Sequence, residues 1–292
     1  MAALTFVHLS DLHFTRSPDE LLFGAVSPRA MLQAAVAVIH RLEVKPAFFV
    51  ISGDLAHEGD PQAYRHLQEG LKELLAPFGV PVLLALGNHD DWQAFSDVMA
   101  GVPTSQLPGR YCYSQWVDRL RVIVLDSHLP GRLDGELGAA QLAWLEQELA
   151  VAAAPEGELV VVHHPVVARG IPMVGEEYVV LRDRDDLAAL LAGKRVLGIL
   201  SGHTHVATTA QFGGTVAVTA GGTAFRCDPA LRTGLRLLAG GSFNLCTLRD
   251  ATLFVNPLPL PSEEHLLAEY QLSDASPPRR AAPLLRDASP EP

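Results

Sequence analysis

The sequence has few cysteines and no excess of basic charge, and both shortages limit what the protein can be. Its three cysteines, Cys112, Cys227 and Cys246, are odd in number and irregularly spaced, so they do not form a disulfide framework. We expect them to be small apolar residues of a protein in a reducing cytoplasm. The formal net charge of −11 at pH 7 argues against a surface that binds nucleic acid or an anionic membrane.

Long hydrophobic runs are also missing. No stretch approaches the roughly 20 apolar residues that a membrane-spanning helix needs. The N-terminus passes directly into a strand-like run at residues 4–9 with no basic or apolar leader segment before it, so we expect no signal peptide. These features together predict a cytoplasmic protein.

Apolar residues, in contrast, make up 48% of the 292 residues, which suffices for the core of one large α/β domain. Residues 28–43, 61–76 and 138–150 carry apolar positions at helical spacing, and each segment lies between strand-like runs. This order predicts right-handed βαβ crossovers and a largely parallel sheet. From about residue 195 the pattern changes to short strands separated by glycine, which predicts a second, more antiparallel sheet packed on the first.

The C-terminal end differs in composition from the rest of the chain. Residues 257–292 hold eight of the 21 prolines and show no apolar period after Tyr270. We therefore divide the chain into a domain at residues 1–256 and a proline-rich extension at residues 257–292. We expect roughly the last twenty residues of the extension to be disordered.

Five short groups of polar residues follow buried strand-like runs in a fixed order, and they are the most informative feature of the sequence. They are Asp11-Leu-His13, Gly53-Asp54, Gly87-Asn88-His89-Asp90, His163-His164-Pro165 and Gly202-His203-Thr-His205. A buried carboxylate or imidazole is costly unless it is paired or bound to a cation. Because strand ends on one edge of a parallel sheet lie close together, groups far apart in sequence can meet there. The sequence therefore predicts a metal site with enough ligands for two ions.

The spacing within the groups supports this prediction. Asp11 and His13 are two residues apart, as are the two histidines of the last group, and on extended backbone such residues face the same side. Asp54 offers two oxygens that can bridge two ions, and Asn88 offers a neutral oxygen. Imidazoles mixed with carboxylates favour Mn, Fe, Zn or Co over a metal that prefers thiolates. A single pair of this kind would mean little, because Asp-x-His and His-x-His are common by chance.

At these groups the chain resembles the calcineurin-like metallophosphoesterases, whose pattern is D-x-H, G-D, G-N-H-D/E, H and G-H-x-H. The resemblance extends from about residue 4 to about residue 250. A closer likeness is to the bacterial cyclic-nucleotide and glycerophosphodiester phosphodiesterases of that superfamily. It rests on four stretches, Leu125-Asp-Ser127, Gly135–Leu145, His163–Pro165 and Gly221–Phe225.

The resemblance implies an α/β fold, a four-layer αββα sandwich of two mixed sheets flanked by helices, with a binuclear metal centre. It also implies how the ligands divide between the ions. One ion is expected on Asp11, His13 and His205, the other on Asn88, His163 and His203, with Asp54 bridging both. The family pattern selects His163 over His164, since its ligand stands two residues before the proline. Mn²⁺ and Fe²⁺ are the metals expected first, with Zn²⁺ and Co²⁺ as alternatives.

The charge of such a centre suggests its substrate. Two divalent ions bring +4, Asp11 and Asp54 remove two charges, and a bridging hydroxide removes one more. The remaining +1 suits one phosphodiester oxyanion. We therefore expect a phosphodiesterase that hydrolyses small organic phosphodiesters by attack of a metal-bound hydroxide, with cyclic nucleotides and glycerophosphodiesters as the leading substrates.

His89 is the expected proton donor to the leaving alkoxide, because in the resembled family this position touches substrate and is not a ligand. Asp90 is expected to orient His89, so both are catalytic candidates. Asn88 and His89 are also expected to contact the substrate.

Two loops, Val166–Arg182 and Gly221–Gly241, follow ligand-bearing strands and are expected to select the substrate. In the second loop, Phe225 could stack on a base and Arg226 could contact phosphate or a polar edge. Phe225 could equally well fill the core.

Other histidines have less specific interpretations. His8 lies inside the first strand and is expected to support the core or the site, not to bind metal. His57 stands three residues after Asp54, where other branches of the superfamily have tyrosine or aspartate. This difference argues against a purple acid phosphatase and a protein phosphatase, and it leaves the role of His57 open.

Three further functions stay open beside the phosphodiesterase. They are a metal-dependent DNA nuclease, a broad phosphatase of the same superfamily, and a scaffold whose metal site is vestigial. The negative charge opposes the nuclease, and the complete ligand set opposes the scaffold. We expect a small-molecule substrate and no stable nucleic-acid or membrane partner, while the sequence leaves homo-oligomerisation open.

Overall fold

A mixed five-stranded sheet forms one half of the protein's centre. In this computed structural model, residues 3–151, 154–170, 179–231, 233–262 and 265–271 are described. The strand order is β13-β12-β1-β2-β3. The strands β1 (Leu4–Leu9), β2 (Phe49–Ser52) and β3 (Val82–Ala85) are parallel, and β12 (Ser242–Arg249) and β13 (Thr252–Pro259) extend the sheet in antiparallel fashion.

A mixed six-stranded sheet forms the other half, in the order β4-β5-β6-β7-β9-β8. Its four inner strands are parallel: β5 (Leu120–Val124), β6 (Gly157–Val161), β7 (Val196–Ser201) and β9 (Thr215–Thr219). The antiparallel strands β4 (Tyr113–Val117) and β8 (Thr208–Phe212) form its two edges.

The prediction that the strands after residue 195 form a second, more antiparallel sheet of their own is wrong. Instead, β7, β9 and β8 complete the six-stranded sheet, with β7 and β9 parallel to each other, while β12 and β13 join the five-stranded sheet. The physical reason is that β1 lies inside its sheet and needs hydrogen-bond partners on both edges. β2 supplies one edge and β12 the other, although β12 is more than two hundred residues away in sequence.

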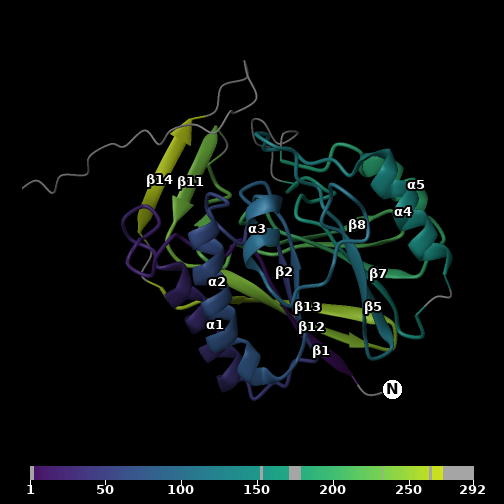
Figure 1. Cartoon of the computed structure of the whole chain (residues 1–292), viewed down its shortest axis with the longest axis horizontal. Coiled ribbons are helices and arrows are strands. Elements are labelled where there is room, and N and C mark those ends of the chain that lie inside the picture. The colour runs from purple at the N-terminus through teal and green to yellow at the C-terminus, as the bar shows by residue number, and fades with distance from the viewer. Residues whose placement is uncertain (1–2, 152–153, 171–178, 232, 263–264, 272–292) are drawn as a thin grey trace, which may run out of the picture.

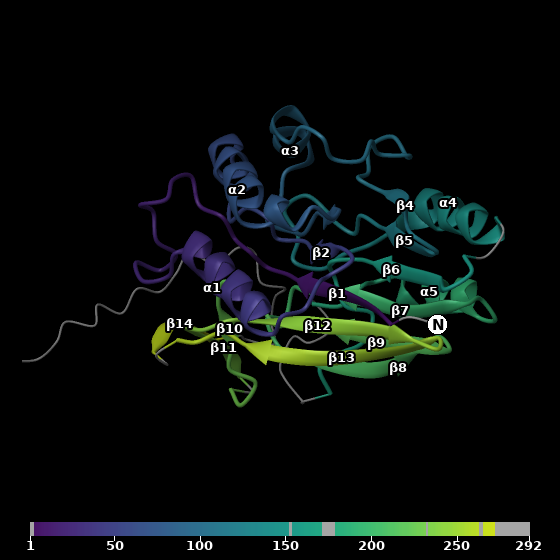
Figure 2. The same cartoon turned by 90° about the horizontal axis from the view of Figure 1, so that it is seen from below.

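A third, small sheet contains β10 (Arg226–Cys227), β11 (Gly234–Leu238) and β14 (Leu266–Gln271) in that order. Figure 2 shows it at one end of the sandwich, beyond β12 and β13. The boundary that we placed after residue 256 falls inside β13, and β14 pairs with β11 along its length. The division into domain and extension stays a prediction, and the expected disordered end at residues 272–292 lies outside the described residues.

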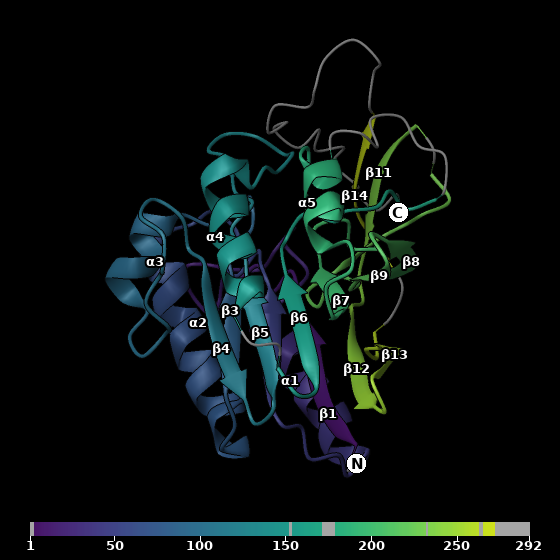
Figure 3. The ribbon, with the colours of Figure 1, turned by 90° about the vertical axis from the view of Figure 1, so that its right-hand side faces the viewer.

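Helices cover the outer faces of the two sheets. Figure 1 shows α1 (Pro28–Arg41) and α2 (Pro61–Leu74) on one side of the molecule, with α4 (Gly138–Ala150) and α5 (Arg184–Leu191) on the other. In Figure 3, α4 and α5 lie in front of β5, β6 and β7. The short helices α3 (Trp92–Val98) and η1 (Ala76–Phe78) accompany α2. The expected four-layer αββα sandwich is confirmed.

Local sequence explains where the first two long helices begin. The Ser27 hydroxyl accepts a hydrogen bond from the Ala30 amide, and the Asp60 carboxylate accepts one from Gln62. In both helices the first residue is a proline, whose fixed φ suits this position and whose missing N–H would have no helical partner.

Two of the three hydrophobic clusters among the described residues lie on opposite faces of the inner strands, because side chains alternate along a strand. In β5, Val122 and Val124 belong to the large cluster that joins residues of both sheets with residues of α1 and α2, while Ile123 belongs to the cluster under α4 and α5. Packing from both faces holds the ends of the parallel strands in place, and those ends carry the polar groups described next.

Candidate metal centre

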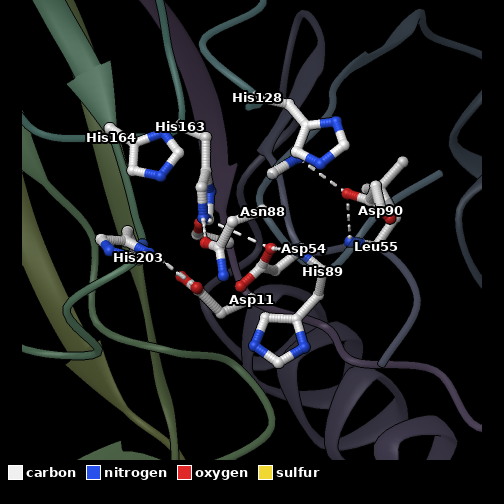
Figure 4. Close-up of polar contacts among 12 residues, drawn as sticks. Asp11, Asp54, Leu55, Asn88, His89, Asp90, His128, His163, His164 and His203 are labelled. Carbon is white, nitrogen blue, oxygen red and sulfur yellow. Dashed lines mark hydrogen bonds and ion pairs between the residues drawn. The ribbon is translucent and has the colours of Figure 1, made fainter. Parts of the chain in front are cut away.

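The five polar groups meet where the ends of β1, β2 and β3 face the ends of β6 and β7. Backbone hydrogen bonds join the loops within each sheet and across the two sheets. The Asp11 amide donates to Gly53 at 3.0 Å on one side, and the Gly202 amide donates to His163 at 3.0 Å on the other. Across the sheets, the Thr223 amide donates to the Ser10 carbonyl at 2.9 Å. Figure 4 shows the side chains of residues from both sheets pointing toward one centre.

The backbone at this centre is not extended, which corrects our explanation of the paired spacing. Asp11, His13, His203 and His205 have φ angles of 55°, 49°, 72° and 54°, in the left-handed region. Each pair follows the last residue of its strand, and its residues turn toward the centre through this less favourable conformation. Positive φ costs free energy in residues other than glycine, and such conformations cluster at functional sites. The pairs converge because of this loop geometry.

One half of the centre gathers around Asp54, which is buried. The Asp54 Oδ1 atom lies 3.3 Å from Nε2 of His163, and that nitrogen lies 3.1 Å from Oδ1 of Asn88. The Nδ1–H of His163 donates to the Ser52 carbonyl at 2.9 Å. In the neutral ring the proton is therefore on Nδ1, and Nε2 is an acceptor that faces two acceptor oxygens.

The other half gathers around Asp11, which is also buried. Its Oδ1 atom lies 3.3 Å from Nε2 of His205, and that nitrogen lies 3.2 Å from Nε2 of His13. The Nδ1–H of His205 donates to the Phe225 carbonyl at 3.0 Å, so its Nε2 is also an acceptor. Asp54 joins the two halves, because its Oδ2 atom lies 3.7 Å from Nε2 of His13.

His203 completes the cluster and gives a specific reason to infer a cation. Its Nε2 atom is buried with no hydrogen-bond partner in the described part of the chain, while its amide donates to both oxygens of Asp11 at 3.1 and 3.2 Å. Leaving a buried polar atom unpaired costs about 1–3 kcal/mol. A cation satisfies this atom and the facing acceptors together, so the residues fit a divalent metal.

The electric field of the centre favours positive charge. Burial alone would raise the pKa of Asp54, but the imidazoles of His163 and His89 outweigh it and hold that pKa well below its usual value. Burial would lower the pKa of His163, yet the Asp54 carboxylate outweighs burial and raises that pKa to about 9. At this position a proton and a metal ion compete for the same lone pair.

Two glycines of the motifs are needed for close approach. A Cβ atom at Gly87 would overlap the Asp54 carboxylate, and one at Gly202 would overlap the Ser10 hydroxyl. Glycine at these positions therefore lets the loops after β3 and β7 come close enough for their side chains to share one centre.

His89 lies beside the centre, and its surroundings correct the role expected of Asp90. The Nδ1–H of His89 donates to the His57 carbonyl at 2.6 Å, so that carbonyl orients the ring. The Asp90 carboxylate instead accepts from the amides of Leu55 and Gly87 and from two further groups, the Ala56 amide and the Tyr64 hydroxyl. Figure 4 shows Asp90 directed toward Leu55 and away from the His89 ring.

Two further histidines are held by hydrogen bonds that explain their positions. His8 is buried, and its ring contacts the Ser52 hydroxyl at 2.9 Å, which fits the supporting role that we expected. His164 contacts the Ser127 hydroxyl through Nδ1 at 2.7 Å and donates from Nε2 to the Leu133 carbonyl at 3.0 Å. Both nitrogens of His164 thus contact groups other than Asp54.

A cavity of about 480 Å³ opens beside the centre. His13, Asp54, Asn88 and His89 line one side of it, and much of the remaining wall is apolar. The apolar wall includes Phe23, Phe225, Cys227, Leu235, Leu237 and Tyr270.

The residues that line the cavity show how much of the two expected substrate loops lies beside the centre. From the first loop, Arg169 and Val179 line the cavity, while residues 171–178 lie outside the described residues. Phe225 lines it too, but is only 4% exposed and stacks on the His205 ring at a centroid distance of 4.2 Å. Arg226 is not among the lining residues in the described ranges.

Arg169 and the β11 residues Leu235 and Leu237 lie within the two expected substrate loops, although the sequence analysis did not name them, while the contribution of β14 was missed. Alternating apolar residues at Leu235 and Leu237 are a signal that could have identified β11. The pairing of β14 with β11, which brings Tyr270 to the cavity, has no comparable local signal.

The fold is an α/β sandwich of two sheets, and carboxylates and imidazoles meet at its strand ends. These features place the chain in the class of α/β proteins that can bind divalent metal ions. Residues 4–207 match the model of the family described as calcineurin-like phosphoesterase, and the chain belongs to that family. The resemblance inferred from the sequence motifs is therefore confirmed.

Two curated relatives and one solved structure are similar to the chain. A probable cyclic nucleotide phosphodiesterase of Rhodococcus erythropolis is 35% identical over 258 residues, covering 87% of this chain and 83% of the relative. A cAMP/cGMP dual specificity phosphodiesterase of Mycobacterium tuberculosis is 35% identical over 229 residues, covering 78% and 70%. The structure of a dimetal phosphatase from Danio rerio has a TM-score of 0.62 at 15% identity, covering 90% and 98% of the two chains. This last likeness supports the fold.

Proposed function

We propose that the protein is a metal-dependent phosphodiesterase whose substrates are small organic phosphodiesters, with cyclic nucleotides as the first class. The observation that carries this proposal is the convergence of acceptor atoms that face one another from both sheets at the edge of the cavity, with the buried Nε2 of His203 unpaired among the described residues. The family assignment and the names of the two phosphodiesterase relatives support it. Glycerophosphodiesters are the second class, because they also present one phosphodiester charge.

We propose two divalent ions at the centre, with Mn²⁺ or Fe²⁺ as the first expectation. Asp11, His13 and His205 would hold one ion, Asn88, His163 and His203 the other, and Asp54 would contact both. Bound there, the metals would polarise the phosphoryl group and lower the pKa of water. The carbonyls of Ser52 and Phe225 keep the protons of His163 and His205 on Nδ1, so each Nε2 is ready to bind.

His89 is proposed to protonate the leaving alkoxide. Because the His57 carbonyl holds the Nδ1–H of its ring, Nε2 is the nitrogen that takes up and releases the proton. The His89 amide donates to Oδ1 of Asp54 at 2.9 Å, which places the ring beside the metal centre. The apolar wall would then receive the organic part of the substrate and exclude water from it.

We also propose the protein's setting in the cell. No described helix is long and apolar enough to cross a bilayer, and the net charge of −11 disfavours stable nucleic-acid binding. We therefore propose a cytoplasmic enzyme acting on a freely diffusing substrate, either as a monomer or as a homo-oligomer.

A hydrolysis panel tests the proposed function. The panel contains cyclic nucleotides, glycerophosphodiesters, aryl phosphate monoesters and diesters, and duplex DNA, each with and without added Mn²⁺. We expect metal-dependent hydrolysis of small diesters, with monoesters and DNA far slower. Faster hydrolysis of DNA would favour the nuclease, and faster hydrolysis of monoesters the phosphatase. No hydrolysis by protein shown to contain two ions would favour the scaffold.

A further inference from the structure

His57 stands beside the centre without belonging to any of the five motifs. Its ring is half-buried and lines the cavity. Nδ1 of His57 lies 3.3 Å from Nδ1 of His13, and the two rings meet edge to face at a centroid distance of 5.3 Å and an angle of 71°. His57 thus contacts Nδ1 of His13, while Nε2 of His13 faces Asp54 and His205 in the centre.

Comparison with the other histidines of the centre indicates how the contact between His57 and His13 affects the His13 ring. His163 and His205 each donate Nδ1–H to a backbone carbonyl, which leaves Nε2 as an acceptor facing the centre. His13 also directs Nε2 toward the centre, 3.2 Å from Nε2 of His205. For Nε2 of His13 to carry a lone pair, the proton of its neutral ring must be on Nδ1, where it faces His57.

We propose that His57 is a positioning residue for His13. The Nδ1 atom of His57 accepts the hydrogen bond from Nδ1–H of His13 and so supplies the orienting contact that backbone carbonyls supply for His163 and His205. This role rests on the proposed metal centre. An outer partner of this kind fixes the tautomer and ring direction of a ligand, and its loss weakens metal binding roughly 10–100-fold.

The side chain and the backbone carbonyl of His57 contact different histidines, so their roles can be tested separately. The carbonyl of His57 accepts the Nδ1–H of His89 at 2.6 Å, and the rings of His57 and His89 stack at 5.3 Å. Replacing the side chain of His57 removes the acceptor for His13 and leaves the carbonyl in place for His89. Metal affinity should therefore change while the proton-donor function of His89 is kept.

A third metal ion is the competing explanation of the cluster, because ring nitrogens of His13, His57 and His89 lie within 4.8 Å of one another. The hydrogen bonds oppose it. Binding a third ion through Nδ1 of His13 would require that nitrogen to lose its proton while Nε2 still faces the centre. The Nδ1 atom of His89 is already engaged with the His57 carbonyl.

The test compares metal affinity in four full-length proteins, the wild type, His57→Ala, His57→Gln and the control His40→Ala. His40 is an exposed histidine on α1, so its loss matches the first change chemically but leaves the centre intact. Each protein is loaded with Co²⁺, and a chelator competes for the metal while the visible spectrum and the bound metal are followed. No substrate is present, so the result does not depend on which diester the enzyme hydrolyses.

We expect His57→Ala to weaken one of two bound ions roughly 10–100-fold and to leave the other nearly unchanged. His57→Gln should regain most of that affinity, because its amide oxygen can accept the hydrogen bond, and His40→Ala should match the wild type. At saturating metal, His57→Ala should keep the wild-type dependence of rate on the leaving group.

Three results would overturn the proposal. One is wild-type affinity for both ions in His57→Ala, and another is a glutamine variant as weak as the alanine variant. The third is three ions in the wild type and two in His57→Ala, which would establish the third-ion site. If metal binding follows the expected pattern but no substrate of the panel is cleaved, the proposed function fails while the role of His57 stands.

Discussion

At the residue scale, the centre consists of hydrogen-bond acceptor atoms that lie close to other acceptor atoms, with no donor hydrogen between them. Nε2 of His163 faces oxygens of Asp54 and Asn88, and Nε2 of His205 faces Nε2 of His13. Neutral rings with these tautomers repel one another at such distances, so the arrangement is favourable only with positive charge among them. Sequence motifs named these residues correctly as neighbours in space, while their division between two ions stays a prediction.

Asp54 is the residue on which both halves of the centre depend. Asp54→Asn keeps the shape of the side chain but removes its charge and replaces an acceptor oxygen by a donor. We expect loss of at least one metal ion and of nearly all activity, measured by metal analysis and turnover. Asp97→Asn, at an exposed position on α3, is the matched control. Wild-type metal content and turnover in Asp54→Asn would contradict the proposed centre.

His89 should act in the chemical step and not in metal binding. His89→Ala is expected to keep both ions and to lose roughly 10²–10⁴-fold in rate, the usual contribution of general acid catalysis. The loss should shrink for a nitrophenyl ester, because that leaving group needs no proton. Rates measured for good and poor leaving groups decide between the roles, since an equal loss for both would mean that His89 only positions the phosphate.

At the scale of elements, Asp90 ties the end of β3 to the loop after β2. Its carboxylate accepts hydrogen bonds from Gly87 on the β3 side and from Leu55 and Ala56 on the β2 side. Its place in the G-N-H-D motif suggested a catalytic role, which stays a prediction, and from these contacts we propose that Asp90 is a structural clamp that brings Asn88 and His89 to the centre. A sequence pattern cannot separate these two roles, because both need a carboxylate at the same position.

Replacing Asp90 should therefore affect stability before it affects chemistry. Asp90→Ala leaves several buried donors unpaired, each costing about 1–3 kcal/mol, so we expect a large fall in the free energy of unfolding. The neighbouring Asp91→Ala removes only the N-terminal cap of α3, worth about 0.5–2 kcal/mol. Denaturant unfolding of both variants measures the difference. Equal stability of the two variants would contradict the clamp.

The strand β14 should influence which substrates bind. Tyr270 lines the cavity, while Leu266 on the same strand is 57% exposed. Tyr270→Ala should raise KM for substrates with a large aromatic group, such as cyclic nucleotides, more than for glycerophosphodiesters. Leu266→Ala is the control and should leave both KM values unchanged. A KM for cyclic nucleotides that Tyr270→Ala does not alter would exclude β14 from substrate selection.

At the scale of the whole molecule, the centre exists because two sheets present their strand ends to each other. Asp11, His13, Asp54 and Asn88 follow strands of the five-stranded sheet, while His163, His203 and His205 follow strands of the six-stranded sheet. Each half of the centre therefore combines residues from both sheets. Metal bound at the centre would therefore hold the two sheets together.

Removing the metal should lower the stability of the entire fold. A ligand that binds only the folded state stabilises it by about 2.7 kcal/mol at a concentration one hundred times its dissociation constant. We expect a strong chelator to lower the melting temperature of the wild type and added Mn²⁺ to restore it, as measured by calorimetry. The melting temperature of Asp54→Asn should respond much less to the chelator. An unchanged wild-type melting temperature would argue against metal at the sheet interface.

The sequence by itself determined the elements whose signal is local. The helices Pro28–Arg41 and Pro61–Leu74 end two residues before their expected bounds, and Gly138–Ala150 matches its expected bounds, because amphipathic spacing involves near neighbours along the chain. The hairpin β4–β5 and the helices α3 and α5 were not expected, since they are short and their apolar residues show no long period.

Only the tertiary structure decided which group is the hydrogen-bond partner of each donor and acceptor in the centre. The motifs named the polar residues and their order, but the left-handed backbone of Asp11 and His203, the His57 carbonyl beside His89 and the clamp at Asp90 were visible only in three dimensions. The physical reason is that a hydrogen-bond partner is chosen by distance through space. Segments that are far apart in the chain meet only after both sheets have packed, and no local pattern contains that information.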